Sequence, residues 1–190
     1  MMVLGIAAAA ALLIPLLTRG SYKRLFDTKF RWPWVLVASL AIQLGLEFFT
    51  LPHRYWDNVG YGLLVLSNVL LLVFAARNVV LRGMSIVFIG IACNALVITL
   101  NHGMPVKFPP DWKNESWAEA TVKHHPQKDG EKLLGLSDII IVRHPINNIL
   151  SFGDLILAVG LCDVSYNASR DPKRAKRKAR RRVARMASRP

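Results

Sequence analysis

The stretch GYGLLVLSNVLLLVFAA, residues 60–76, carries no charged side chain, and its interior is apolar except at Ser67 and Asn68. The hydrocarbon of a bilayer is about 30 Å thick, and a helix of roughly 17 to 25 mainly apolar residues crosses it. Four more runs of this kind occur, at residues 1–17, 33–50, 84–100 and 148–166. The sequence therefore predicts an all-α integral membrane protein, a bundle of five transmembrane helices.

The overall composition fits this prediction. The chain of 190 residues is 53% hydrophobic and has a mean hydropathy of +0.31, yet its formal net charge is +13. These values are compatible because the apolar residues are gathered in long runs and the charges lie between or after them. The first run is expected to be a retained helix and not a cleaved signal peptide, because no basic residue precedes it and Arg19 follows it directly.

The positions of lysine and arginine predict the orientation. Five lie in residues 18–32, two follow the third run in residues 77–83, and eleven lie from residue 170 to the end, whereas residues 101–147 have six basic and six acidic side chains. Short loops rich in positive charge stay in the cytoplasm. We therefore expect an external amino terminus, an extracytoplasmic segment at residues 101–147 and a cytoplasmic carboxyl terminus.

The chain is expected to divide into a transmembrane domain, residues 1–169, and a basic cytoplasmic tail, residues 170–190. Such dense like charge repels itself, so the tail is expected to be disordered. Each of its charges near anionic lipid contributes about 1 kcal/mol of attraction. The residues expected to contact lipid are Lys173, Arg174, Lys176, Arg177, Lys178, Arg180, Arg181 and Arg182. A protein partner for the tail stays open, but nucleic acid is not expected, because no aromatic residues for base stacking are interleaved.

Polar residues inside the runs recur at helical spacing. Residues three, four or seven apart share one helix face. The sets are Ser39, Gln43, Glu47 and Thr50; Tyr61 and Asn68; Gly90, Asn94 and Asn101; and Ser151, Asp154, Ala158, Cys162 and Ser165. Lipid disfavours exposed polar groups, so these faces should meet inside the bundle. With the predicted orientation, they fill its outer half like a funnel that is open to the outside.

Asp154 is the most unusual member of these sets, because it would lie about 9 Å inside the last run. An acid in the centre of a membrane helix costs roughly 2.5 to 3.5 kcal/mol, which favours a ligand, ion or proton contact. The alternative is packing, with amides contributing about 0.6 kcal/mol each as interhelical hydrogen bonds. The candidate ligand-binding residues are Asp154, Ser151, Asn94, Asn101, His102, Glu47 and Gln43.

Motifs of known chemistry are missing from the sequence. There is no Gly-x-Ser-x-Gly elbow and no phosphate loop, so we expect no enzyme. The histidines lack the spacing of a metal site, and the pair His124–His125 is interpreted as a solvated loop pair, so no metal and no cofactor are expected. The run LSDIIIV, residues 136–142, is too short to span and is interpreted as an interfacial or re-entrant piece.

Three segments carry a family resemblance: NALVITLNHGMPV at residues 94–106, LSDIIIV at 136–142 and NNILSFGDLILAVG at 147–160. They resemble a family of small bacterial, mostly actinobacterial, polytopic membrane proteins described only as a domain of unknown function. The matching positions are Asn101, Gly103, Met104, Pro105 and Val106; Leu136 and Asp138; and Ser151, Gly153 and Asp154. The resemblance implies a multi-pass protein of the bacterial plasma membrane, but no activity or ligand.

Two classes of function remain open. In the first, a polar pocket centred on Asp154 binds a small polar ligand, a cation or a proton. In the second, the protein is a non-catalytic subunit or scaffold of a membrane complex that docks a membrane-protein partner through its external segment or its basic tail. In that case the polar faces serve only for packing.

Overall fold

The computed structural model describes residues 2–48, 56–112, 121–144 and 147–170. Thr50 and the expected lipid-contacting residues between 173 and 182 lie outside these ranges.

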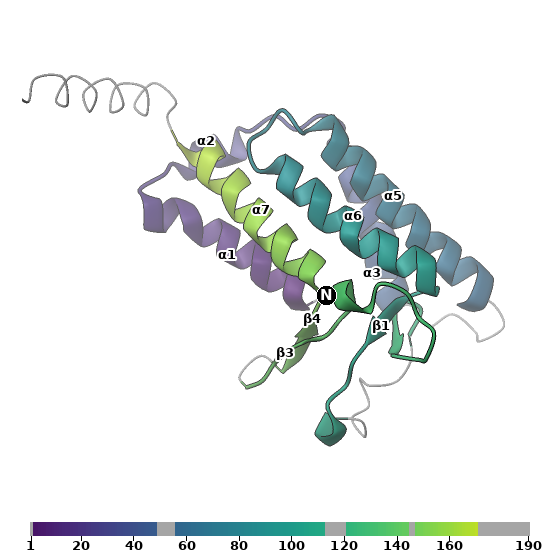
Figure 1. The fold of residues 1–190 in the computed structure, drawn as a ribbon. Coiled ribbons are helices and arrows are strands. Elements are labelled where there is room, and N and C mark those ends of the chain that lie inside the picture. Colours follow the sequence, from purple (N-terminus) through teal and green to yellow (C-terminus); the bar gives the residue numbers. More distant parts are fainter. Residues whose placement is uncertain (1, 49–55, 113–120, 145–146, 171–190) are drawn as a thin grey trace, which may run out of the picture.

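The fold is mostly helical, as predicted (Figure 1). Its five long helices are α1 (Met2–Thr18), α3 (Pro33–Phe48), α5 (Tyr61–Arg77), α6 (Met84–Asn101) and α7 (Phe152–Ser169). A short helix, α2 (Tyr22–Phe26), lies between α1 and α3, and a π-helical turn, η1 (Trp56–Gly60), precedes α5. Two helical stretches, Asn58–Arg77 and Met84–Asn101, are long and apolar enough to cross a membrane.

The long helices pack in the order α1, α7, α6, α5, α3. Helices α6 and α7 approach closely because glycines line their contact: a Cβ atom on Gly90 would lie 2.6 Å from the backbone nitrogen of Leu157. Small residues allow this approach between apolar helices. On the other side of the bundle, the buried hydroxyl of Ser39 on α3 donates to the Ser67 carbonyl of α5 at 2.8 Å. Within the described residues, α1 and α3 do not pack along each other.

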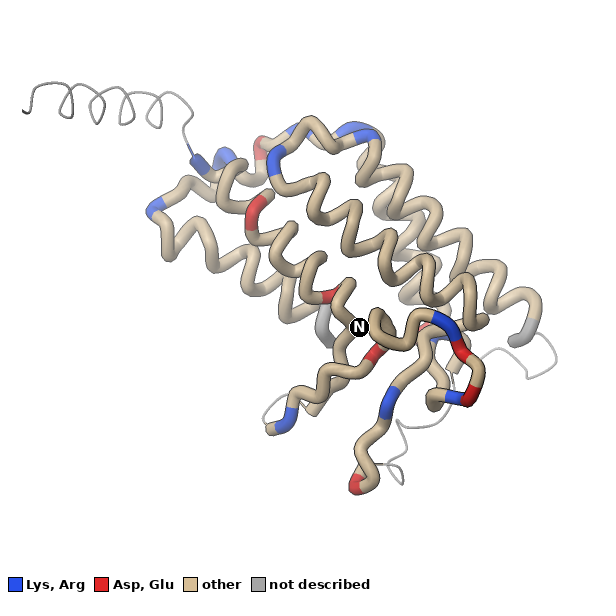
Figure 2. Tube along the Cα trace, in the orientation of Figure 1, with Lys and Arg blue, Asp and Glu red and all other residues tan. Residues whose placement is uncertain are grey.

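One end of the bundle, here called the basic end, carries the links α1–α3 and α5–α6 and the end of α7. Figure 2 shows mostly lysine and arginine there. The Asn78 amide holds the two links together, because it donates to the Arg31 carbonyl at 2.9 Å and accepts the Arg31 N–H at 2.7 Å. The rings of Phe30 and Phe74 pack beside this contact with centroids 5.8 Å apart. The basic end is therefore closed by ordered chain.

The opposite end is covered by the connecting segment, residues 102–151, which runs from α6 to α7. Its strand β1 (Met104–Val106) pairs in parallel with β2 (His124–Pro126), and β3 (Ile140–Val142) pairs antiparallel with β4 (Asn148–Leu150). A 3₁₀ turn, η4 (Leu134–Leu136), lies between the two sheets in sequence. Met104 and Val106 are buried, so the segment packs onto the bundle. It forms a cap over this end.

Two expectations for this region need correction. The last helix begins at Phe152, not at residue 148, because Ser151 is its N-cap and residues 148–150 form β4. The run at residues 136–142 is not a re-entrant piece, because its first residue closes a 3₁₀ turn, Ser137 and Asp138 are buried, and residues 140–142 form β3; its interfacial location stays a prediction. Pairing with β4 satisfies backbone groups that a lone apolar run of this length would leave open.

Candidate functional site

The start of α7 is built around a capping box. The Ser151 hydroxyl accepts the Asp154 N–H at 3.0 Å, and Asp154 Oδ2 accepts the Ser151 N–H at 3.1 Å. This arrangement satisfies two backbone donors that a helix start otherwise leaves without partners. The negative charge also lies near the positive end of the helix dipole. The structure thus places Asp154 in the first turn of α7, nearer the helix start than the 9 Å expected from the sequence.

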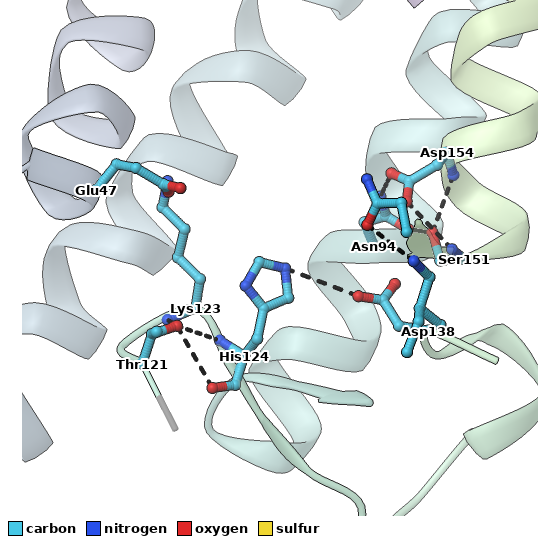
Figure 3. A network of polar contacts seen from close by, with 10 residues as sticks. Glu47, Asn94, Thr121, Lys123, His124, Asp138, Ser151 and Asp154 are labelled. Carbon is cyan, nitrogen blue, oxygen red and sulfur yellow. Dashed lines mark hydrogen bonds and ion pairs between the residues drawn. The ribbon is translucent and has the colours of Figure 1, made fainter. Parts of the chain in front are cut away.

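Asn94 of α6 completes this group. Its amide nitrogen donates to Asp154 Oδ1 at 2.8 Å, and its amide oxygen accepts the Ser151 hydroxyl at 2.9 Å. Figure 3 shows the three side chains gathered on one side of the site. Each donates to or accepts from the others, so Asp154 is held by α6 as well as by its own helix. Both oxygens of this carboxylate have partners.

A cavity of about 900 Å³ lies within the bundle beneath the cap. All five long helices and the connecting segment contribute to its wall. Its polar and charged wall residues include Glu47, Asn94, Lys123, His124, Asp138 and Asp154. Towards the basic end the wall is apolar, with Phe74 and Met84 among its members. The cavity is therefore polar at the capped end and mainly apolar towards the basic end, with Asn68 of α5 as a polar wall residue part of the way along.

Lys123 is the residue that joins the cap to the far side of the bundle. Its side chain is only 11% exposed, and its ammonium donates to the Gln43 carbonyl at 2.7 Å and to Glu47 Oε2 at 2.9 Å. A lysine so enclosed needs a charge partner and further acceptors. Glu47, with 40% of its side chain exposed, supplies the charge partner. The expected role of Gln43 is thus modified, since its backbone carbonyl makes this contact.

His124 and Asp138 face each other between these two groups (Figure 3), with His124 Nε2 3.7 Å from Asp138 Oδ2. Burial raises the pKa of the Asp138 carboxyl to about 8, and the nearby negative charge of Asp154 acts in the same direction. Burial lowers the pKa of His124 to about 4, although 44% of its side-chain surface is exposed. Burial therefore favours the uncharged form of both side chains.

Two of the candidate ligand-binding residues, Asn101 and His102, lie beside the cavity and make structural contacts there. Asn101 holds the connecting segment to α6: its amide donates to the Lys132 carbonyl at 2.9 Å and accepts the Lys132 N–H at 2.8 Å. His102 ends α6 with a left-handed backbone, φ 56°, and its ring stacks on Tyr61 at 4.8 Å between centroids. Neither residue is part of the cavity wall, and Ser151 lies behind Asp154.

The sequence analysis missed Lys123, His124 and Asp138 as site residues. The pair His124–His125 is not a solvated loop pair, because His124 lines the cavity and the His125 side chain is 13% exposed. A signal for Asp138 was present, since its LSD segment carries the family resemblance. Among the described residues, no group of three or more His, Cys, Asp or Glu side chains is placed to hold a metal ion.

Fold and site together define a helical-bundle protein with two helices of membrane-spanning length and composition and a capped internal cavity. The chain belongs to the DUF5317 family, a family of unknown function, whose model matches residues 27–164. The resemblance to a domain of unknown function is thus confirmed. The match covers α3, α5, α6, the connecting segment and most of α7. Comparisons with curated proteins and with solved structures give no match.

Proposed function

We propose that this is a multi-pass protein of the bacterial plasma membrane, with five spans, an external amino terminus and a cytoplasmic carboxyl terminus. Successive long helices run in alternating directions, so the connecting segment and the basic end lie at opposite ends of the bundle. The described lysines and arginines of the basic end fit the cytoplasmic side. The proposal gives the cap an extracytoplasmic location.

Within this topology, we propose that the protein binds a ligand in the capped cavity. The observation that carries the proposal is the cavity of about 900 Å³, whose charged wall residues come from α3, α7 and two parts of the connecting segment. Ligand pockets in proteins have volumes of roughly 300 to 1,000 Å³ and combine an apolar wall with few, well-placed polar groups. A bundle built for packing alone would close this volume, because voids reduce stability.

The proposed role is binding without catalysis. The Asp154 carboxylate, on which the predicted pocket was centred, is engaged through both oxygens in a helix cap and a bond to Asn94. Lys123 is likewise occupied by Glu47 and Gln43. Groups fixed in this way position a ligand and shape the polarity of its site. The Asp138–His124 pair supplies the polar groups that are least committed to other partners.

The experiment is native mass spectrometry of the protein released from its own membranes in a mild detergent. Leu71→Trp places a large ring in the cavity wall of α5, whereas Leu66→Trp adds the same ring on the exposed face of that helix, where Leu66 is 47% exposed. We expect a bound mass on the wild type and on Leu66→Trp and its loss from Leu71→Trp. Wild-type protein without any bound mass, or equal retention by both variants, would contradict the proposal.

A further inference from the structure

The cavity has the length and the polarity gradient of a membrane lipid. Met84 and Ile98 of α6 both line it, and they lie about 21 Å apart along the helix at 1.5 Å per residue. One leaflet of a bilayer has a hydrocarbon depth of about 15 Å. An acyl chain of one leaflet therefore fits beside the apolar wall, and its headgroup reaches the polar capped end. In the proposed topology this orientation is that of an outer-leaflet lipid.

The charge of the capped end discriminates between headgroups. Among the residues that the structure describes, the cavity wall has three carboxyl groups, on Glu47, Asp138 and Asp154, and one basic side chain of the lysine or arginine type, Lys123. Glu47 neutralises Lys123. The remaining charge is negative, so a phosphate in this position meets like charge. His124 and Asp138, which face each other at 3.7 Å, are an imidazole and a carboxyl whose uncharged forms are favoured by burial, and such groups suit hydroxyl groups.

The packing order leaves a lateral route to the cavity. Helices α1 and α3 are the two ends of the packing order, and within the described chain they do not pack along each other. Ala8 of α1 is exposed and yet lines the cavity, and Leu36 and Leu40 of α3 line it as well. An apolar molecule in the membrane can therefore enter between α1 and α3 without passing through the cap.

We propose that the cavity holds an outer-leaflet lipid with an uncharged, hydroxyl-bearing headgroup, which enters between α1 and α3 and places its headgroup beneath Lys123, His124 and Asp138. This inference rests on the proposed binding function and names the class of ligand. The apolar walls of all five helices hold the acyl chain. The cap covers the headgroup from the aqueous side.

The test uses the full chain in phosphatidylcholine nanodiscs and two photoactivatable probes with identical diazirine-labelled acyl chains, a diacylglycerol and a phosphatidic acid. The two probes differ only at one headgroup position, which is a free hydroxyl in the diacylglycerol and carries a phosphate in the phosphatidic acid. We expect the diacylglycerol to label cavity-lining Leu40, Leu71 and Leu161 about tenfold more than the phosphatidic acid does. Labelling of the lipid-facing residues Val37, Leu66 and Val159 should be similar for both probes, which corrects for unequal partitioning.

Access is tested with Ala8→Trp, which narrows the gap between α1 and α3. Ala9→Trp is the matched control, because Ala9 is exposed on the same helix and does not line the cavity. We expect cavity labelling to fall several-fold in the first variant alone. Equal labelling in both variants would overturn the route between α1 and α3. If size-exclusion chromatography shows that Ala8→Trp is misfolded, Leu36→Trp tests the same gap from the side of α3.

The outcomes separate this inference from the binding function on which it rests. Equal or stronger cavity labelling by phosphatidic acid would overturn the assignment of the headgroup. Absence of cavity labelling by both probes, combined with a bound mass that Leu71→Trp removes, would overturn the lipid assignment and leave the binding function standing. Absence of labelling together with absence of any bound mass would overturn both.

Discussion

The substitution Asp138→Asn tests the electrostatics of the capped cavity through the pH dependence of stability. In the folded protein the Asp138 pKa is raised from 3.8 to about 8 by burial. Between these values the folded state holds a proton that the unfolded state has released. The stability contribution is therefore largest at low pH and is lost as the pH rises towards 8.

His124 acts in the opposite direction over a different range. Its pKa is lowered by burial from 6.5 to about 4, so the unfolded state binds the extra proton between these values and stability rises with pH. From about pH 4 to 6.5 the two contributions oppose each other, and that of His124 is the smaller, because 44% of its side chain is exposed and solvent screens its charge. From pH 6.5 to about 8 only the loss due to Asp138 remains. At about 1.4 kcal/mol per pH unit, this loss amounts to about 2 kcal/mol.

The assay is thermal unfolding in detergent micelles, followed by tryptophan fluorescence at pH 5, 6.5 and 8. For a chain of this size, about 2 kcal/mol corresponds to a fall in Tm of roughly 4 to 8 °C between pH 6.5 and 8. Asp138→Asn should remove this fall and reveal the rise due to His124 between pH 5 and 6.5. Asp129→Asn, an exposed residue of the same segment, should behave like the wild type. Retention of the fall in Asp138→Asn would show that the Asp138 carboxyl does not cause it.

Two further predictions concern the helices. Gly90→Ala should lower the free energy of unfolding in sodium dodecyl sulfate by about 1 to 3 kcal/mol, because the new Cβ atom meets the α7 backbone. Gly62→Ala is the control, because open space surrounds this helical glycine. It should raise that free energy by about 0.5 to 1 kcal/mol, since alanine favours the helix more than glycine does. Asp154→Asn should cost about 1 to 2 kcal/mol in the same assay through the weakened helix cap, and an unchanged unfolding curve would show that the capping box does not support α7.

The sequence predicted the five helical runs and the inward polar faces because both depend on short-range periodicity. Asn94 and Asp154 were placed on facing stripes, and the structure joins them through a hydrogen bond. The start of α7 was missed because the apolar residues Ile149 and Leu150 directly precede it and continue its apolar run. The Ser-x-x-Asp pattern of a capping box was present at Ser151 and gives the correct boundary.

The remainder of the site depends on contacts that no local pattern contains. Lys123 reaches Glu47 across 76 positions of sequence, and its position follows from the parallel pairing of β1 with β2. Strands β1 and β2 are three residues long, which is too short for an alternation of apolar and polar residues to be recognised in the sequence. Backbone hydrogen bonds fix the position of Asp138: its N–H donates to the Pro105 carbonyl, and its carbonyl accepts the Lys107 N–H. The cap over the cavity is therefore a tertiary feature.

The central claim is that an extracytoplasmic cap closes the polar end of the bundle by bringing Lys123 to Glu47. The most direct measurement adds a short, membrane-impermeant bismaleimide to right-side-out membrane vesicles that contain Glu47→Cys/Lys123→Cys, with Cys93 and Cys162 replaced by alanine. Glu47→Cys/Lys128→Cys is the control, because Lys128 is exposed in the same segment. We expect strong intramolecular cross-linking of the first pair and little of the control. Equal cross-linking of both pairs would contradict the cap, and cross-linking in inside-out vesicles alone would contradict its extracytoplasmic location.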